Sequence, residues 1–326
     1  MSPLILDQPD DRFCQLPGFP LDPDVVKREA PDLIALTPDG RGRCSLWWSS
    51  TPPLEGKRIG YVGHFAVTDS SAAPPLLRWA CDRLAAEGCA SAVGPIDGST
   101  WQRYRLITER GDEPPFLLEP DNPDDWPDLF TAAGFTPLAH YSSALNATLA
   151  APDPRLPMLA QKLHDAGYTI RTVDMDHFED ELRRAHALSL LSFAGNFLYS
   201  PIGEADFLAQ YAAIRRFIRP DLVLLAERKG ELAGYLFAIP DLLRAQRGEP
   251  VNTVILKTLA VHPAHGSIGL GSLLMARGHE VARQAGFTRA IHALFRDTNL
   301  SGRISAHTAH VFRRYTLFAR PLGERR

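Results

Sequence analysis

The sequence is poor in cysteine and has no long hydrophobic run. Four of its 326 residues are cysteine, and no two of them show C-x-x-C spacing. We therefore expect buried reduced thiols rather than a disulfide framework or a metal site. The longest apolar stretches, such as residues 222–226, are far short of the ~18 residues that a membrane helix needs. The first eleven residues carry no basic side chain, so no secretory signal is expected, and we expect a soluble, cytoplasmic protein with no membrane partner.

Glycine and proline are also too scarce for global disorder. They account for 24 and 27 of the 326 residues, well below the roughly 25–30% that marks low-complexity sequence. The formal net charge of −3 hides an asymmetry, because residues 1–150 carry a net charge of −9 and residues 151–326 a net charge of +6. The split favours two modules with different partners, although solvated helix faces would give the same counts. The positive charge is too dilute to predict a nucleic-acid partner.

Proline also indicates where the chain divides. Three prolines lie within residues 150–157, and proline fits neither a helix interior nor a central strand. At roughly 100–200 residues per domain the chain is long enough for two. We therefore predict domains at residues 1–150 and 151–326.

The two halves share one order of predicted elements, which indicates an internal duplication. Each half contains a strand, a loop, a helix that ends at a glycine, a second strand, a further helix and a closing strand. The closing strands match around Tyr141 and Tyr315, at a period of roughly 175 residues. We expect these elements at 59–67, 75–87, 90–93, near Leu129 and at 138–144 in the first half, and at 254–261, 272–285, 289–295 and 314–318 in the second.

More elements precede the matching set in the second half. Apolar residues at helical spacing predict helices over 182–191 and 207–218. A hairpin follows, and Gly230 supplies the positive φ that its turn needs. A helix then joins the strand at 254–261 to a parallel partner, so the sheet must be mixed.

A glycine-rich loop between the strand at 254–261 and the next helix carries the chemistry. Its glycines lie at positions 266, 269 and 271, and they let several backbone N–H groups point at one place. The helix predicted from Ser272 adds its unpaired amides and its dipole. Together these groups form a cradle for a diphosphate, although a tight connection without a ligand would look the same. The loop matches neither the Walker motif nor G-x-G-x-x-G.

With these elements around it, the segment 180–322 resembles the GCN5-related N-acetyltransferase (GNAT) superfamily. Val261 and Pro263 fit the family's V-x-P strand end, and 266–271 fits its Q/R-x-x-G-x-G/A loop, with Gly266 in place of the usual Gln or Arg. Asn299 fits the family's Asn after the next strand. The resemblance implies an α/β fold of two tandem GNAT-like domains, each a mixed, mostly antiparallel sheet with flanking helices.

The resemblance also implies a cofactor and its site. Acetyl-CoA or a related acyl-CoA would lie between the strands at 254–261 and 289–295, with its pantetheine arm along the first strand and its pyrophosphate in the loop. The residues implied in binding it are Leu259, Ala260, Val261, Gly266, Ser267, Ile268, Gly269, Leu270, Gly271, Ser272 and Asn299.

The family's usual catalytic acid is missing. Family members place a Tyr about seven residues after the Asn, and position 306 is Ala. His307, His310 or Tyr315 could replace it, although each could equally be an ordinary surface or strand residue. A thiolate is a tolerable leaving group near neutral pH, so the demand for an acid is modest.

The first half looks like a degenerate copy. Its loop at 68–75 has no glycine and bears Asp69, whose carboxylate would repel phosphate, so we expect at most one CoA site. The segment 94–105 follows a strand and is dense in polar and aromatic side chains. We expect Trp101, Arg103 and Tyr104 to line an acceptor pocket, although an ordinary turn with its aromatic rings in the core would fit too.

These patterns predict an acyltransferase that moves an acetyl or other acyl group from acyl-CoA to a small-molecule or peptide amine by direct attack. The acidic first half favours a cationic acceptor. Two alternatives stay open: a catalytically silent CoA-binding or scaffold protein of the same fold, and a Fem-like aminoacyl-transferase. The acceptor, the acyl length, the general base and the oligomeric state are not predicted.

Overall fold

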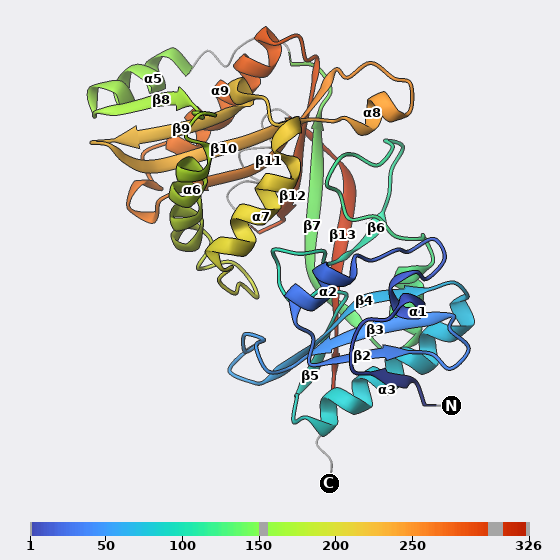
Figure 1. Ribbon diagram of the computed structural model, residues 1–326. Helices are drawn as coiled ribbons and strands as arrows, with labels where there is room; N and C mark the ends of the chain where they lie inside the picture. The colour runs from blue at the N-terminus through green and yellow to red at the C-terminus, as the bar shows by residue number, and fades with distance from the viewer. Residues whose placement is uncertain (1, 150–155, 299–308, 324–326) are drawn as a thin grey trace.

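The computed structural model describes residues 2–149, 156–298 and 309–323, and these build one mixed sheet with helices on its faces (Figure 1). The first half contributes β1 (Leu4–Leu6), α1 (Asp11–Cys14), α2 (Pro23–Glu29), β2 (Leu33–Leu36), β3 (Gly42–Trp47), β4 (Ile59–Val67), α3 (Ala73–Ala86), β5 (Ser91–Gly94), β6 (Leu106–Glu109), α4 (Trp126–Ala132) and β7 (Thr136–Asn146). The second half contributes α5 (Leu156–Asp165), β8 (Tyr168–Thr172), α6 (Phe178–Ser192), α7 (Glu204–Ile214), β9 (Val223–Arg228), β10 (Glu231–Pro240), α8 (Leu243–Gln246), β11 (Thr253–Val261), α9 (Leu270–Gln284), β12 (Arg289–Arg296) and β13 (His310–Pro321). Short 3₁₀ turns lie at Ser70–Ala72, Arg215–Phe217, Pro220–Leu222 and Pro263–His265.

The closing strands of the two halves are exchanged. The strand order is β1-β2-β3-β4-β5-β13-β7-β12-β11-β10-β9-β8, with β6 paired to β13 at the side. Thus β13 extends the sheet of the first half and β7 that of the second, and the two run antiparallel to each other with Tyr315 opposite Tyr141. Figure 1 shows them side by side through both bodies of the molecule. The fold is therefore two halves joined through their closing strands.

The predicted elements agree with the structure in order and nearly in position. The parallel pairs β4–β5 and β11–β12 make the sheet mixed, as expected. The hairpin of β9 and β10 turns through Lys229 and Gly230, both with positive φ. Several boundaries differ, for example α6 and β13 begin four residues earlier than predicted, and two of the differences have a clear cause. The helix α9 begins at Leu270 rather than Ser272, because Gly269 at φ +90° ends the loop there, and α7 ends at Ile214 because the chain tightens into a 3₁₀ turn before Pro220.

Some predictions fall outside the described residues. The helix expected before the last strand falls largely on 299–308, and the proposed domain boundary falls on 150–155. No helix within the described ranges is long and apolar enough to cross a membrane. The four cysteines are buried free thiols, and burial raises their pKa.

Separate apolar clusters hold the helices on the sheet. In the second half α5 and α9 pack on one face, whereas α6 and α7 pack on the other. In the first half α3 and α4 cover β3, β4 and β5. Trp101 and Phe116 of the first half join the cluster beneath α6 and α7, so the first half reaches into the second beside β11 and β12.

Candidate active site

The parallel strands β11 and β12 separate partway along their length. They are paired from Thr253 with Arg289 to Leu256 with His292, and not beyond. A register shift against β7 and a positive φ at Leu294 bend β12 at that point. From Lys257 onward, β11 keeps only its pairing with β10, so its other edge faces an opening.

A cavity of about 850 Å³ fills this opening. The separated strand segments 256–259 and 292–296 form one wall, and aromatic rings come from Phe193, directly after α6, and from Tyr211 of α7. The first half closes the cavity with residues 100–105, residues 118–121 and Tyr141. The site is therefore built from both halves of the chain.

The glycine-rich loop lies where β11 leads into α9. The backbone amides of residues 267–272 donate no hydrogen bond to another described residue. The last three of these amides belong to the first turn of α9. Gly269 has φ +90°, and a Cβ there would lie 3.1 Å from Leu159 of α5, so glycine is required. Gly266 has φ −66° and open surroundings. The loop thus offers a row of free N–H groups at a helix start, as an anion site requires.

The implied pantetheine-binding segment is partly occupied within the protein. Leu259, Ala260 and Val261 pair with β10 on one side. On the other side, the Val261 amide donates to Ser192 Oγ of α6 at 3.2 Å. A ligand carbonyl can replace the Ser192 hydroxyl as the acceptor of this amide, so the free edge of β11 remains available to a ligand.

All three residues expected in the acceptor pocket line the cavity. Trp101 donates from Nε1 to the Ser200 carbonyl at 2.9 Å and meets Phe193 edge-on. Arg103 donates to the Asp121 carbonyl. Trp101 also packs partly into the core. The segment 94–105 can therefore line a pocket and anchor an aromatic ring in the core at the same time.

The expected acid–base residues lie elsewhere or outside the described ranges. His307 and Asn299 fall within 299–308. His310 is exposed at the start of β13. Tyr315 is fully buried, its hydroxyl contacts Ser143 and donates to Glu119, and burial raises its pKa. Neither described residue lines the cavity, and their catalytic roles stay predictions.

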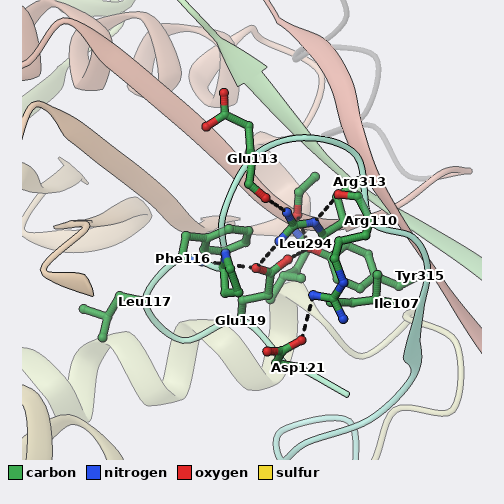
Figure 2. Close-up of polar contacts among 12 residues, drawn as sticks. Ile107, Arg110, Glu113, Phe116, Leu117, Glu119, Asp121, Leu294, Arg313 and Tyr315 are labelled. Carbon is green, nitrogen blue, oxygen red and sulfur yellow. Dashed lines mark hydrogen bonds and ion pairs between the residues drawn. The ribbon is translucent and has the colours of Figure 1, made fainter. Parts of the chain in front are cut away.

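Glu119 fixes the first half against β13 (Figure 2). Its Oε2 lies 2.6 Å from Arg313, and both side chains are fully buried. Arg313 also donates to the Arg110 carbonyl at 2.8 Å, and Arg110 binds Asp121. Burial raises the pKa of Glu119, while Arg313 acts against that rise. The network holds residues 110–121 in place, and with them one wall of the cavity.

Lys257 and Arg105 also line the cavity; the sequence interpretation missed Lys257, and it included Arg105 in the segment 94–105 without singling it out. Lys257 donates to the Leu118 carbonyl at 3.1 Å. Burial, with a smaller contribution from Arg105, lowers the pKa of Lys257 to about 7, although part of the side chain opens to the cavity. The sequence signal for Lys257 was a single charged residue within the largely apolar strand predicted at 254–261.

The described residues contain no group of three or more His, Cys, Asp or Glu that could hold a metal ion. His279 of α9 and His292 of β12 form a buried pair, with their Nε2 atoms 2.8 Å apart. Burial lowers their pKa values to about 4 and about 3, so both are neutral near pH 7.

Comparison with known sequences gives two matches. The model of the acetyltransferase (GNAT) family matches residues 186–307. A curated relative, described as bacterial ceramide synthase from Caulobacter vibrioides, is 26% identical over 198 residues, which is 59% of this chain and 50% of the relative. The chain thus spans about half the length of that relative.

Solved structures share the fold over nearly the whole chain. A GCN5-related glucosamine N-acetyltransferase region of a fungal GH3 β-N-acetylglucosaminidase superposes with a TM-score of 0.56 at 13% identity, covering 98% of this chain and 38% of that one. A GCN5-related N-acetyltransferase from Sphaerobacter thermophilus gives 0.51 at 13%, covering 98% and 96%. A tandem GNAT protein from the clavulanic acid pathway gives 0.51 at 14%, covering 100% and 99%. These likenesses establish the tandem fold.

Proposed function

The second half of the chain carries a domain of the GNAT acetyltransferase family, and from that premise we propose that the protein is an acyl-CoA-dependent N-acyltransferase. It would move an acetyl or other acyl group from acyl-CoA to an amine. The observation that carries the proposal is the row of free amides at residues 267–272, next to the strand edge where β11 leaves β12.

The residues present fit an acyl-CoA. The loop amides and the N-terminus of α9 would hold the pyrophosphate, and the edge of β11 from Leu259 to Val261 would hold the pantetheine arm. When bound, the acyl-CoA supplies a thioester carbon activated for attack. Gly266 gives no side chain to the phosphates, so affinity depends on the backbone.

The cavity would hold the amine, and Lys257 is the best placed proton acceptor within the described ranges. The amine nitrogen forms a bond to the thioester carbon, the C–S bond breaks, and the ammonium proton passes to the Lys257 Nζ. A pKa of about 7 leaves a large neutral fraction of Lys257 at neutral pH, as a general base requires. His307 and His310 remain candidates for protonating the thiolate. Tyr315 fits this role less well, because its hydroxyl is bound to Glu119.

A negative charge placed at the start of α9 tests the proposal. Ser272 is exposed in the first turn of α9, where an acidic side chain does not destabilise a helix. We expect Ser272→Glu to weaken CoA binding about tenfold or more, and the uncharged Ser272→Gln to retain it. Thermal stabilisation by CoA and thiol release with an amine panel are the measurements. Unchanged binding in Ser272→Glu would place CoA elsewhere, and binding without thiol release would favour the silent CoA-binding alternative.

A lipid amine or a long acyl chain is a second candidate substrate. The curated relative is described as a ceramide synthase, and aromatic and aliphatic side chains such as Phe193, Phe197 and Leu256 line the cavity. We expect thiol release to increase from acetyl-CoA to longer acyl-CoA donors if the cavity receives the chain. Equal or falling rates with chain length would contradict this candidate.

A further inference from the structure

Arg105 lies in the wall of the cavity, as the last residue of the segment 94–105 and directly before β6. It is 5% exposed. Its guanidinium carbon lies 4.1 Å from the ring centre of Tyr104 and 4.3 Å from that of Tyr141. The two rings fix the plane of the guanidinium at the cavity.

Within the part of the chain that the structure describes, this buried arginine has no counter-charge. Its Nη1 donates to the Tyr104 hydroxyl at 2.9 Å, but its Nε has no hydrogen-bond partner, and no carboxylate in the described ranges forms an ion pair with it. An unpaired buried charge is destabilising, so an anion is the group that this position lacks.

The acids of the cavity wall are already paired. Glu119 is held by Arg313, and Asp121 by Arg110. Two other arginines of the wall, Arg103 and Arg296, are cationic like Arg105 and form no ion pair with a described carboxylate, and Lys257 adds no negative charge in either protonation state. The cavity is therefore an electropositive site, even though the first half as a whole carries a net charge of −9.

We propose that the cavity binds an anionic group of the substrate, a carboxylate or a group of like charge, at Arg105. This inference rests on the proposed function. It predicts an anionic substrate group where the sequence favoured a cationic acceptor. A guanidinium presents two parallel N–H donors to a carboxylate, and the Nε that lacks a partner is one of the donors available. The carboxylate could belong to the acceptor amine, as in an amino acid, or to the acyl group, as in a dicarboxylic acyl-CoA.

Pairs of charged and neutral probes test this inference on the full chain without CoA. Butyrate is compared with butyramide, and octanoate with octanamide, by calorimetric titration. We expect the carboxylates to bind about tenfold more tightly than the amides, because a charge-assisted pair with arginine replaces a neutral contact. The preference should vanish in Arg105→Met and persist in part in Arg105→Lys. Arg244→Met, which removes a largely buried arginine paired with Glu249 away from the cavity, should leave it unchanged.

Two results would overturn the inference: wild-type protein that does not distinguish carboxylates from amides, or a preference that survives Arg105→Met. The first needs no variant, so a folding defect in Arg105→Met would leave the test valid. Succinyl-CoA binding more tightly than butyryl-CoA would assign the carboxylate to the acyl group. Undiminished octanoate binding at saturating butyryl-CoA would assign it to the acceptor. Failure of the proposed function would instead appear as absent CoA binding, with the carboxylate preference intact.

Discussion

The two halves contain the same pair of parallel strands, yet only one pair opens. In the first half β4 and β5 are paired from Ile59 to Tyr61, and the chain then stays close, with the Ile96 amide donating to the Val62 carbonyl at 3.0 Å. In the second half β11 and β12 separate after Leu256. The first strand of each pair has nine residues, and its first residue is paired with the first residue of its neighbour.

One position explains the difference. The fifth residue is Gly63 in β4 and Lys257 in β11. A Cβ on Gly63 would lie 2.2 Å from the Ile96 carbonyl oxygen, so only glycine lets the first pair stay closed. Lys257 instead places a long side chain where the second pair opens. Glycine at this position is therefore a condition for the closed pair, and the open pair has no glycine there.

The loops that follow β4 and β11 also differ, in whether they leave room for an external anion. In the first half Asp69 accepts a hydrogen bond from the Ser71 amide at 2.8 Å and pairs with Arg41 at 2.7 Å, and these contacts lower its pKa. The chain's own carboxylate thus occupies the place of an external anion. In the second half the loop amides are free among the described residues. This difference supports the prediction of at most one CoA site.

The largest effect is expected from opening the closed pair. Gly63→Ala should lower the free energy of unfolding by about 3 kcal/mol, because its methyl group meets a backbone carbonyl that cannot move without breaking the sheet. Urea unfolding measures the loss. Gly266→Ala is the matched control, since its methyl group meets only Pro263 O at 3.5 Å, and we expect a change of under about 0.5 kcal/mol. Equal losses in the two variants would refute the comparison.

The second effect concerns Lys257 and pH. Its pKa is about 7 in the folded protein against 10.5 for an ordinary lysine, so the folded state binds fewer protons between these values. The stability of wild-type protein should therefore rise relative to Lys257→Met from about pH 7 to pH 10, and kcat/KM should rise with an apparent pKa near 7 that the variant lacks. Of the groups around Lys257, Arg105 and Glu119 interact with it, while burial keeps His292 and Tyr211 from titrating near pH 7. Identical pH profiles would exclude Lys257 as the base.

A smaller gain is expected from restoring a side chain that the loop lacks. Gly266→Arg has room and an ordinary φ, so it should fold normally and add a charge-assisted contact to phosphate. We expect CoA to bind up to about tenfold more tightly. Gly266→Gln serves as the uncharged control. No gain in either variant would mean that the phosphates lie away from this position.

The smallest effect is expected from Asp69→Ala. Losing this N-cap of a short 3₁₀ turn should lower the free energy of unfolding only slightly. It should not create a second CoA site, because the strands behind it remain closed. Stoichiometry from calorimetry measures this, and two CoA molecules per chain would contradict the account.

The sequence predicted the local structure well, because periodicity, stop glycines and turn residues act over short distances. It could not predict the exchange of β7 and β13, which depends on pairing between residues about 174 positions apart, such as Tyr141 and Tyr315. Trp101, Arg103 and Tyr104, which follow a strand end, line the cavity, and their role in holding an acceptor stays a prediction. Lys257 was missed, and Arg105 lay within the segment 94–105 without being singled out, because the importance of both lies in charge within a cavity that the two halves share. The net charge of each half does not describe the local charge of that cavity.

The most direct test of the central claim is calorimetric titration of the full chain with CoA. The account predicts one CoA per chain, with binding lost or weakened about tenfold in Ser272→Glu and kept in Ser272→Gln. No binding by wild-type protein, or equal binding by both variants, would show that the free amides of residues 267–272 do not hold a nucleotide.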